Sequence, residues 1–231
     1  MTDVAHNLRQ LLAELPQGVR LVAVSKSHPP EMIEEAYRTG WRVFGENKAQ
    51  EMKAKHDVLP PDIQWHFIGH LQTNKIKYIV PYVALIHSID SYKLLAEVDK
   101  QAARAGRVVD CLLQVHIASE ETKSGFSPDE CRQALATTPW RTLEHVRLRG
   151  LMGMATNTDD VEQIRREFRL LNKLFHELKA TYFAADETFG ELSMGMSDDY
   201  REAIGEGSTM VRVGSKIFGE RTYNNNPVVT T

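Results

Sequence analysis

Residues 20–45 read RLVAVSKSHPPEMIEEAYRTGWRVFG, and the rest of the fold can be predicted from this unit. The apolar run at 20–25 predicts a buried strand, and a second run at 41–45 predicts the next one. Between them, Pro29 and Pro30 suit the first turn of a helix, and Gly40 is a natural end for it. A strand, a helix and a strand in this order are typical of an α/β fold with a parallel sheet.

The same unit recurs along the chain. Eight apolar runs predict strands, and every strand except the last is clearly followed by a helical pattern. Most of the runs are continuously apolar, as parallel strands covered on both faces must be. The predicted strands are residues 20–25, 41–45, 64–68, 84–89, 108–117, 148–152, 191–195 and 210–213.

Eight such units in 231 residues predict a single (β/α)8 TIM-like barrel that occupies the whole chain, residues 1–231. An additional amphipathic helix is expected within residues 1–19, and the polar end of the chain, residues 223–231, is expected to be flexible. The alternative fold is an open, doubly wound sheet. It is disfavoured because no Gly-x-Gly-x-x-Gly motif follows the first strand.

The composition is that of an ordinary globular protein, with 42% hydrophobic and 26% charged residues and a net charge of -3. No basic patch predicts a nucleic-acid or anionic-membrane partner, and no apolar run has the length of a membrane span. The first residues show no secretory signal. Cys111 and Cys131 lack metal-ligand spacing and are predicted to be reduced core thiols. We therefore expect a cytoplasmic protein without a metal.

Lys26 follows the first predicted strand and is the most informative residue for function. Burying an ammonium group is costly, so a lysine at the end of an apolar strand is tolerated best where the site uses its amine. Desolvation lowers the pKa of a lysine, and the neutral amine can attack a carbonyl to form a Schiff base. The alternative is a lysine whose stem packs at the strand end while its amine reaches water.

Small-residue turns after the seventh and eighth strands predict a phosphate site. Gly195-Met196-Ser197 and Gly214-Ser215 offer backbone N–H groups and hydroxyls to an anion, where phosphate usually binds in such barrels. Because the first strand of a closed barrel pairs with the eighth, Lys26 is expected beside this cup. A ligand with a phosphate at one end and an aldehyde near the other would satisfy both, and pyridoxal 5'-phosphate (PLP) is such a ligand.

Arg212 and Gly214 are two residues apart, so they lie on the same side of the eighth predicted strand. If that side faces inward, its guanidinium lies under the barrel mouth and meets the ring nitrogen or the phosphate. An arginine has no acceptor and would keep a pyridine nitrogen unprotonated. The alternative is an ion pair with a carboxylate across the barrel.

At this point several motifs together resemble the YggS/PROSC family of pyridoxal phosphate-binding proteins. The resemblance covers most of the chain, from about Leu21 to Arg221, with its motifs in the right order. These motifs are Val22-Ala23-Val24-Ser25-Lys26, Phe44-Gly45-Glu46-Asn47, the stretch 65–75 (WHFIGHLQTNK), Leu151-Met152-Gly153-Met154, the stretch 192–199 (LSMGMSDD) and the stretch 211–219 (VRVGSKIFG).

The resemblance implies a barrel of the alanine racemase type (PLP fold type III) and a covalent aldimine between Lys26 and PLP. It also implies a monomeric, cytosolic vitamin B6 homeostasis protein that holds PLP and delivers it to apo PLP-enzymes, without established catalysis and without a metal. Besides Lys26, the residues implied to bind the cofactor are Asn47, His70, Met154, Ser193, Ser197, Arg212, Gly214 and Ser215.

Two other functions stay open at this point. The first is a PLP-dependent amino-acid racemase, which needs a second base opposite the lysine. His66, His70 and Lys123 are candidates for that base, and Lys123 is alternatively an accessory amine for cofactor exchange. The second is an aldolase-like enzyme that uses a lysine Schiff base without a cofactor.

Overall fold

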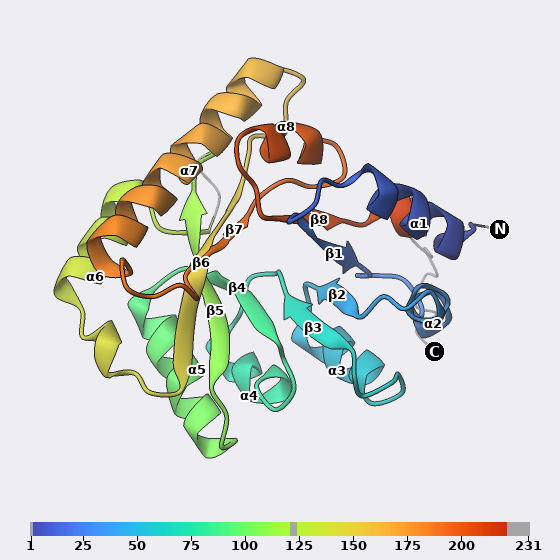
Figure 1. Ribbon diagram of the computed structural model, residues 1–231. Coiled ribbons are helices and arrows are strands. Elements are labelled where there is room, and N and C mark those ends of the chain that lie inside the picture. Colours follow the sequence, from blue (N-terminus) through green and yellow to red (C-terminus); the bar gives the residue numbers. More distant parts are fainter. Residues whose placement is uncertain (1, 121–123, 221–231) are drawn as a thin grey trace, which may run out of the picture.

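A computed structural model describes residues 2–120 and 124–220, and over these residues the chain forms one closed barrel of eight parallel strands. The strands follow one another around the barrel in sequence order, and β1 closes the barrel by pairing with β8 (Figure 1). The predicted fold class is therefore confirmed. The strands are β1 (Arg20–Val24), β2 (Val43–Glu46), β3 (Gln64–Phe67), β4 (Leu85–Ile89), β5 (Val109–His116), β6 (Val146–Met154), β7 (Glu191–Ser193) and β8 (Met210–Val213).

The helices surround the strands (Figure 1). They are α1 (Val4–Glu14), α2 (Pro30–Arg38), α3 (Ala49–His56), α4 (Ile76–Ile79), α5 (Tyr92–Arg104), α6 (Pro128–Thr137), α7 (Val161–Tyr182), α8 (Tyr200–Gly205) and α9 (Ser215–Phe218). The helical segment after β3 is divided into a 3-10 turn (Thr73–Lys75) and α4, and the short α9 after the last strand was not predicted.

Local signals explain where several helices begin. Ser127 caps α6 by accepting from the Glu130 N–H at 3.2 Å, and Glu130 accepts in return from the Ser127 N–H at 2.7 Å. Pro30 occupies the first turn of α2, where its missing N–H costs nothing. Along α7, buried residues recur at three- and four-residue spacing, and they pack against the barrel.

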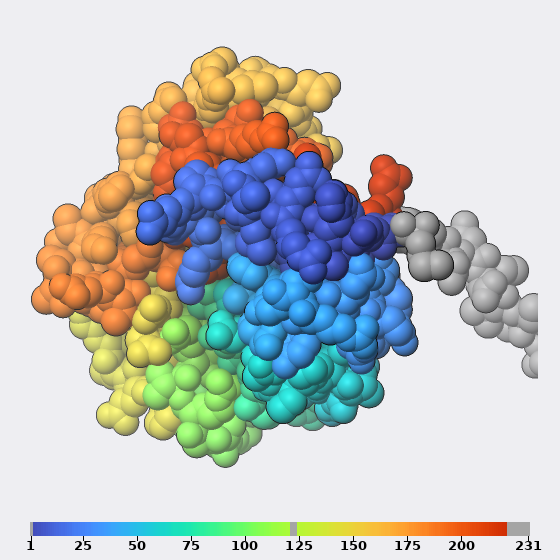
Figure 2. Space-filling model, turned by 45° about the vertical axis from the view of Figure 1, so that its right-hand side comes forward, coloured from blue at the N-terminus to red at the C-terminus, as the bar shows by residue number. Residues whose placement is uncertain are grey.

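The N-terminal helix α1 packs beside the closing strands of the barrel. Val4, Leu8 and Leu11 form its buried face, and the helix lies against α2 and α9. Figure 2 shows α1 in dark blue as a ridge between the light blue α2 region and the orange-red end of the described chain. The residues 223–231, for which a flexible tail was predicted, lie outside the described residues.

The barrel has two apolar regions, one outside the strands and one inside them, and the inner region also contains buried polar side chains. The larger core lies between the strands and the helices and contains Trp65, Phe44 and Phe168. A small second cluster, formed by Val22, Leu85, Leu112, Met152 and Met210, comes from inward-facing strand positions. Buried polar side chains of β3, β4, β7 and β8 accompany it, namely His66, His87, Ser193 and Arg212. None of the helices in the described part of the chain is long and apolar enough to span a membrane.

Candidate functional site

A cavity of about 540 Å³ opens at the carboxyl ends of β1, β6, β7 and β8. The structure brings six of the nine predicted site residues into its lining: Lys26, Met154, Ser197, Arg212, Gly214 and Ser215. The remaining lining residues were not predicted, and they are Val24, His28, Ile68, Met196, Asp198, Gly219 and Glu220. This is the end of a (β/α)8 barrel where functional side chains gather.

Lys26 lies in the turn after β1 and is half-buried. The strand itself ends at Val24, so the lysine is not the last strand residue but the second residue beyond it. Parallel pairing of Val22 with Arg212 and of Ala23 with Val213 brings this turn beside the one that follows β8. The predicted closeness of Lys26 to the Gly214-Ser215 turn therefore follows from barrel closure.

The turns after β7 and β8, which were predicted to hold a phosphate, form one side of the cavity. The Gly214 N–H donates to the Ser197 Oγ at 3.2 Å, which ties the two turns together. Gly195 has a φ of +96°, a left-handed conformation that favours glycine, and its carbonyl accepts from the Arg212 N–H at 2.9 Å. The carboxylates of Asp198 and Glu220 also line the cavity, so its charge is mixed.

Arg212 faces inward, as the alternation along β8 predicts, and its side chain is buried below the mouth. Its Nη1 donates to the Ser193 carbonyl oxygen at 2.8 Å and to the Ser193 Oγ at 2.6 Å, and its Nη2 donates to the Gly153 carbonyl at 3.0 Å. These partners are carbonyls and a hydroxyl, not the carboxylate of the alternative interpretation. Burial lowers the pKa of Arg212 to about 10, and the negative charge of Asp199 opposes this decrease. The guanidinium is therefore still a cation at neutral pH.

A chain of hydrogen bonds continues from Arg212 into the barrel. The Ser193 Oγ lies 3.0 Å from His87 Nδ1, and His87 Nε2 lies 3.0 Å from His66 Nδ1. Burial lowers the pKa of His66 to about 3 and that of His87 well below its ordinary value, with His66 and Arg212 as further causes for His87. Both imidazoles are therefore neutral at physiological pH.

The other predicted site residues lie elsewhere. Ser193 is fully buried beneath the cavity, where it contacts Arg212, and it is not in the lining. Asn47 follows β2 outside the lining, with its backbone packed against Gly69. His70 is exposed, lies 3.4 Å from Asp90 and lines a separate recess of about 470 Å³. Lys123 lies outside the described residues.

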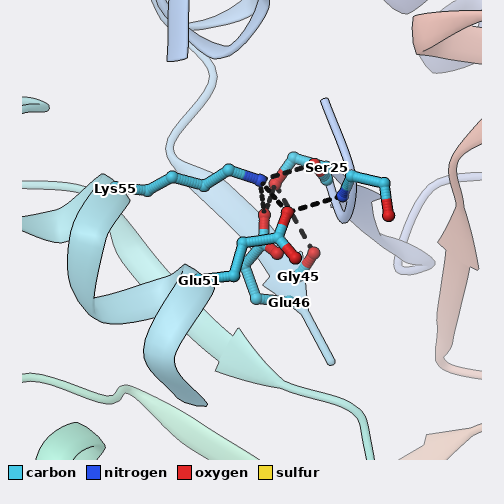
Figure 3. A network of polar contacts seen from close by, with 6 residues as sticks. Ser25, Gly45, Glu46, Glu51 and Lys55 are labelled. Carbon is cyan, nitrogen blue, oxygen red and sulfur yellow. Dashed lines mark hydrogen bonds and ion pairs between the residues drawn. The ribbon is translucent and has the colours of Figure 1, made fainter. Parts of the chain in front are cut away.

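A buried ionic network behind the Lys26 turn was missed by the sequence analysis (Figure 3). Lys55 Nζ contacts Glu46 Oε1 at 2.7 Å, Glu51 Oε1 at 2.7 Å and the Ser25 carbonyl at 2.8 Å. The Ser25 hydroxyl donates to Glu46 Oε1 at 2.6 Å. Burial raises the pKa of Glu46 to about 7, with Lys55 and Ser25 opposing the rise. The spacing of Glu51 and Lys55 by four residues on α3 was the one signal available in the sequence.

Comparison with known proteins agrees with this architecture. The family model described as "Alanine racemase, N-terminal domain" matches residues 1–222. The chain is 42% identical over 205 residues to a pyridoxal phosphate homeostasis protein of Aquifex aeolicus, covering 88% of each chain. It is 38% identical over 244 aligned positions to the human protein of the same name, covering 97% of this chain and 86% of the human one.

Solved structures show the same relationship. PipY of Synechococcus elongatus without PLP superposes with a TM-score of 0.87 at 38% identity, covering 94% of this chain and 100% of PipY. PipY with PLP bound superposes with a TM-score of 0.83 at 37% identity over the same shares. An alanine racemase of Clostridium difficile, at 12% identity and a TM-score of 0.74, shares the fold. The chain therefore belongs to the YggS/PROSC family of pyridoxal phosphate homeostasis proteins, whose barrel is that of the alanine racemase N-terminal domain.

Proposed function

We propose that this protein binds PLP in the cavity at the barrel mouth, holds it as a Schiff base on Lys26, and serves in intracellular PLP homeostasis by delivering it to PLP-dependent apoenzymes. The observation that carries the proposal is the meeting of Lys26 with Ser197, Gly214 and Ser215 in the lining of one cavity. The names of the relatives and the PLP bound to PipY support it.

The residues present fit the aldehyde, the phosphate and the pyridine ring of this cofactor. The Lys26 amine would attack the aldehyde carbon, so that a C=N bond forms and the carbonyl oxygen leaves as water. The hydroxyls of Ser197 and Ser215 and the backbone at Gly214 would hold the phosphate. Arg212, which also lines the cavity, would leave a pyridine nitrogen that it meets unprotonated, and the ring would then be a weaker electron sink.

We further propose that the protein is a carrier and not a racemase. Racemisation needs proton transfer on both faces of the substrate, hence a second base opposite the lysine. Neither His66 nor His70 lies in the described lining of the cavity, and His66 lies beneath it as a neutral imidazole whose Nδ1 contacts His87. Asn47 and His70 are accordingly proposed as outer residues of the site, without direct contact to the cofactor. We propose a cytoplasmic, monomeric state for the carrier.

The absorption spectrum of the purified protein incubated with PLP tests the Schiff base. We expect a yellow protein whose imine band disappears on borohydride reduction, with the reduced adduct on the peptide that carries Lys26. In Lys26→Ala the band is lost while the fold is retained. Lys53→Ala, a change at an exposed lysine of α3, is the matched control and keeps the band. An unchanged band in Lys26→Ala would show that another lysine forms the Schiff base, and Lys123 would be the first to test.

The carrier function has its own test. The holo-protein is incubated with L-amino acids, and formation of D-isomers and deuterium exchange at Cα are followed. We expect neither, together with transfer of PLP to an added apoenzyme. Sustained production of D-isomers would contradict the carrier function and identify the protein as a racemase.

A further inference from the structure

The turn that presents Lys26 has a conformation that a serine rarely adopts without support. The Ser25 carbonyl accepts from the His28 N–H at 3.1 Å, which closes a four-residue β-turn with Lys26 and Ser27 at its centre. Ser27 has a φ of +66°, the only positive φ at a non-glycine residue in the described chain. Left-handed backbone costs roughly 1 kcal/mol at such a residue, so the surrounding structure must hold this turn in place.

Two side chains of α3 supply that support. The Ser27 N–H donates to Glu51 Oε1 at 2.6 Å, and the Ser25 carbonyl accepts from Lys55 Nζ at 2.8 Å. The peptide groups on both sides of Lys26 are therefore bound by two residues of α3. Figure 3 shows Lys55 and Glu51 reaching from the helix toward Ser25.

Glu46 completes the network from the end of β2. Its Oε1 accepts from both Lys55 Nζ and the Ser25 hydroxyl, and the carboxylate is fully buried. Lys55 is only 5% exposed. A buried ion pair is weak evidence for stability, because replacing both partners by apolar residues is often neutral or stabilising. Stability alone therefore does not explain why a buried ion pair lies beside the Lys26 turn.

From this geometry we propose that Lys55, Glu46 and Glu51 form a positioning network for Lys26. The network acts on the backbone of the Lys26 turn, holding the amine at the distance from the phosphate end of the cavity that imine formation requires. This proposal rests on the proposed function, because it concerns the reactivity of the same lysine. None of the three residues lies in the described lining of the cavity, so none is proposed to touch the cofactor.

The position of the network predicts an effect on imine formation that is separate from phosphate binding. Lys55 and Glu51 contact the turn after β1, whereas Ser197 and Ser215 follow β7 and β8. Misplacement of a reacting group by about 1 Å can cost on the order of a hundredfold in rate. Binding of a ligand that has the phosphate but no aldehyde should therefore survive a change that slows imine formation.

The experiment compares the double variant Glu46→Gln/Lys55→Met with Lys53→Met. The double change removes both charges of the buried Glu46–Lys55 pair together, while Glu51, which also loses Lys55, keeps contact with water because its side chain is 23% exposed. Lys53 is the matched control, because it lies on the same helix and pairs at the surface with Asp57 at 2.6 Å. Glu51→Gln is a second, milder variant that keeps an acceptor oxygen for the Ser27 N–H. Each protein is examined for imine formation with PLP by stopped-flow absorbance and for binding of pyridoxine 5'-phosphate, which lacks the aldehyde, by calorimetry.

We expect imine formation to slow by roughly tenfold to a hundredfold in the double variant and by a smaller factor in Glu51→Gln. Affinity for pyridoxine 5'-phosphate should stay within about twofold of wild type in both, and Lys53→Met should match wild type in both assays. Equal imine rates in the double variant, Glu51→Gln and Lys53→Met would overturn the positioning role. Parallel losses of imine formation and pyridoxine 5'-phosphate affinity would also overturn it, because they indicate general damage to the site. Absence of imine in the wild type would refute the proposed function itself, which is a different outcome.

Discussion

A Cβ atom placed on Gly214 would lie 2.9 Å from the backbone carbonyl oxygen of Val24 and 3.3 Å from its Cβ. The last residue of β1 and the first residue after β8 are therefore in direct backbone contact at the seam where the barrel closes. This contact sets the separation between the Lys26 turn and the Gly214-Ser215 turn. A side chain at position 214 would force the two turns apart.

The change Gly214→Ala is expected to weaken both stability and PLP binding. Gly214 has a negative φ of -121°, so the expected effect arises from the short contact with the Val24 carbonyl. Overpacking of this kind costs roughly 1–3 kcal/mol. Urea unfolding and PLP titration measure the two effects. Gly205→Ala is the control, since nothing lies within 4 Å of a Cβ there. PLP affinity in Gly214→Ala equal to that of Gly205→Ala would contradict the prediction.

Arg212→Met tests the role of the guanidinium below the cavity. The change leaves the carbonyls of Ser193 and Gly153 without their donor, and a buried group that loses its hydrogen bond costs about 1–3 kcal/mol. We expect a loss of that size in the free energy of unfolding, measured by urea denaturation without PLP. Arg165→Met, at an exposed ion pair, is expected to stay within about 0.5 kcal/mol of wild type. Equal stability of the two variants would show that Arg212 does not stabilise the barrel.

Glu46 makes the protein less stable as the pH rises. Its pKa is about 7 in the folded state and 4.5 ordinarily, so between these values the folded state keeps a proton that the unfolded state has lost. The contribution to the free energy of unfolding is fully present below pH 4.5 and falls as the pH rises to 7, by up to about 1.4 kcal/mol per pH unit. Glu46→Gln removes this contribution, so the stabilities of variant and wild type should diverge over that range. Parallel stability curves would contradict the assigned shift.

The buried histidines give the opposite dependence on pH. Below the ordinary pKa of 6.5 the unfolded chain gains protons that His66 and His87 do not accept in the folded state. Stability is therefore lost as the pH falls, by up to about 1.4 kcal/mol per pH unit for each histidine. His87→Gln should lose less stability on acidification than wild type, whereas exposed His6→Gln should follow wild type. Urea unfolding at a series of acidic pH values measures the difference. Identical acid profiles for all three proteins would show that His87 does not resist protonation.

Much of the fold was predictable because its signals are local. The start and type of most strands and helices follow from apolar runs, prolines and caps that lie within a few residues of each element. The missed features are short or depend on context. They include the four-residue helix α9 and the early start of β6 at Val146. Propensity alone carries little information over so few residues.

The candidate site was predictable only in part, and the division has a physical reason. Strand ends of a parallel barrel meet at one mouth, so Lys26, Ser197, Gly214 and Ser215 could be placed together from strand order. Successive residues of a strand point to opposite faces, so a shift of one position decides whether a residue just beyond the strand faces the mouth. For this reason His70 faces a different recess and Asn47 lies outside the lining.

The sequence by itself determined the eight-unit barrel, the lysine after its first strand and the small-residue turns after its last two. Only the tertiary structure decided which side chains hold the lysine and these turns in place. The Ser193 hydroxyl meets His87 across 106 positions of sequence, and Lys55 meets the Ser25 carbonyl across 30. Hydrogen bonds require an approach of about 3 Å in a defined direction, and the packing of distant elements against one another, not the pattern within any one of them, provides that accuracy.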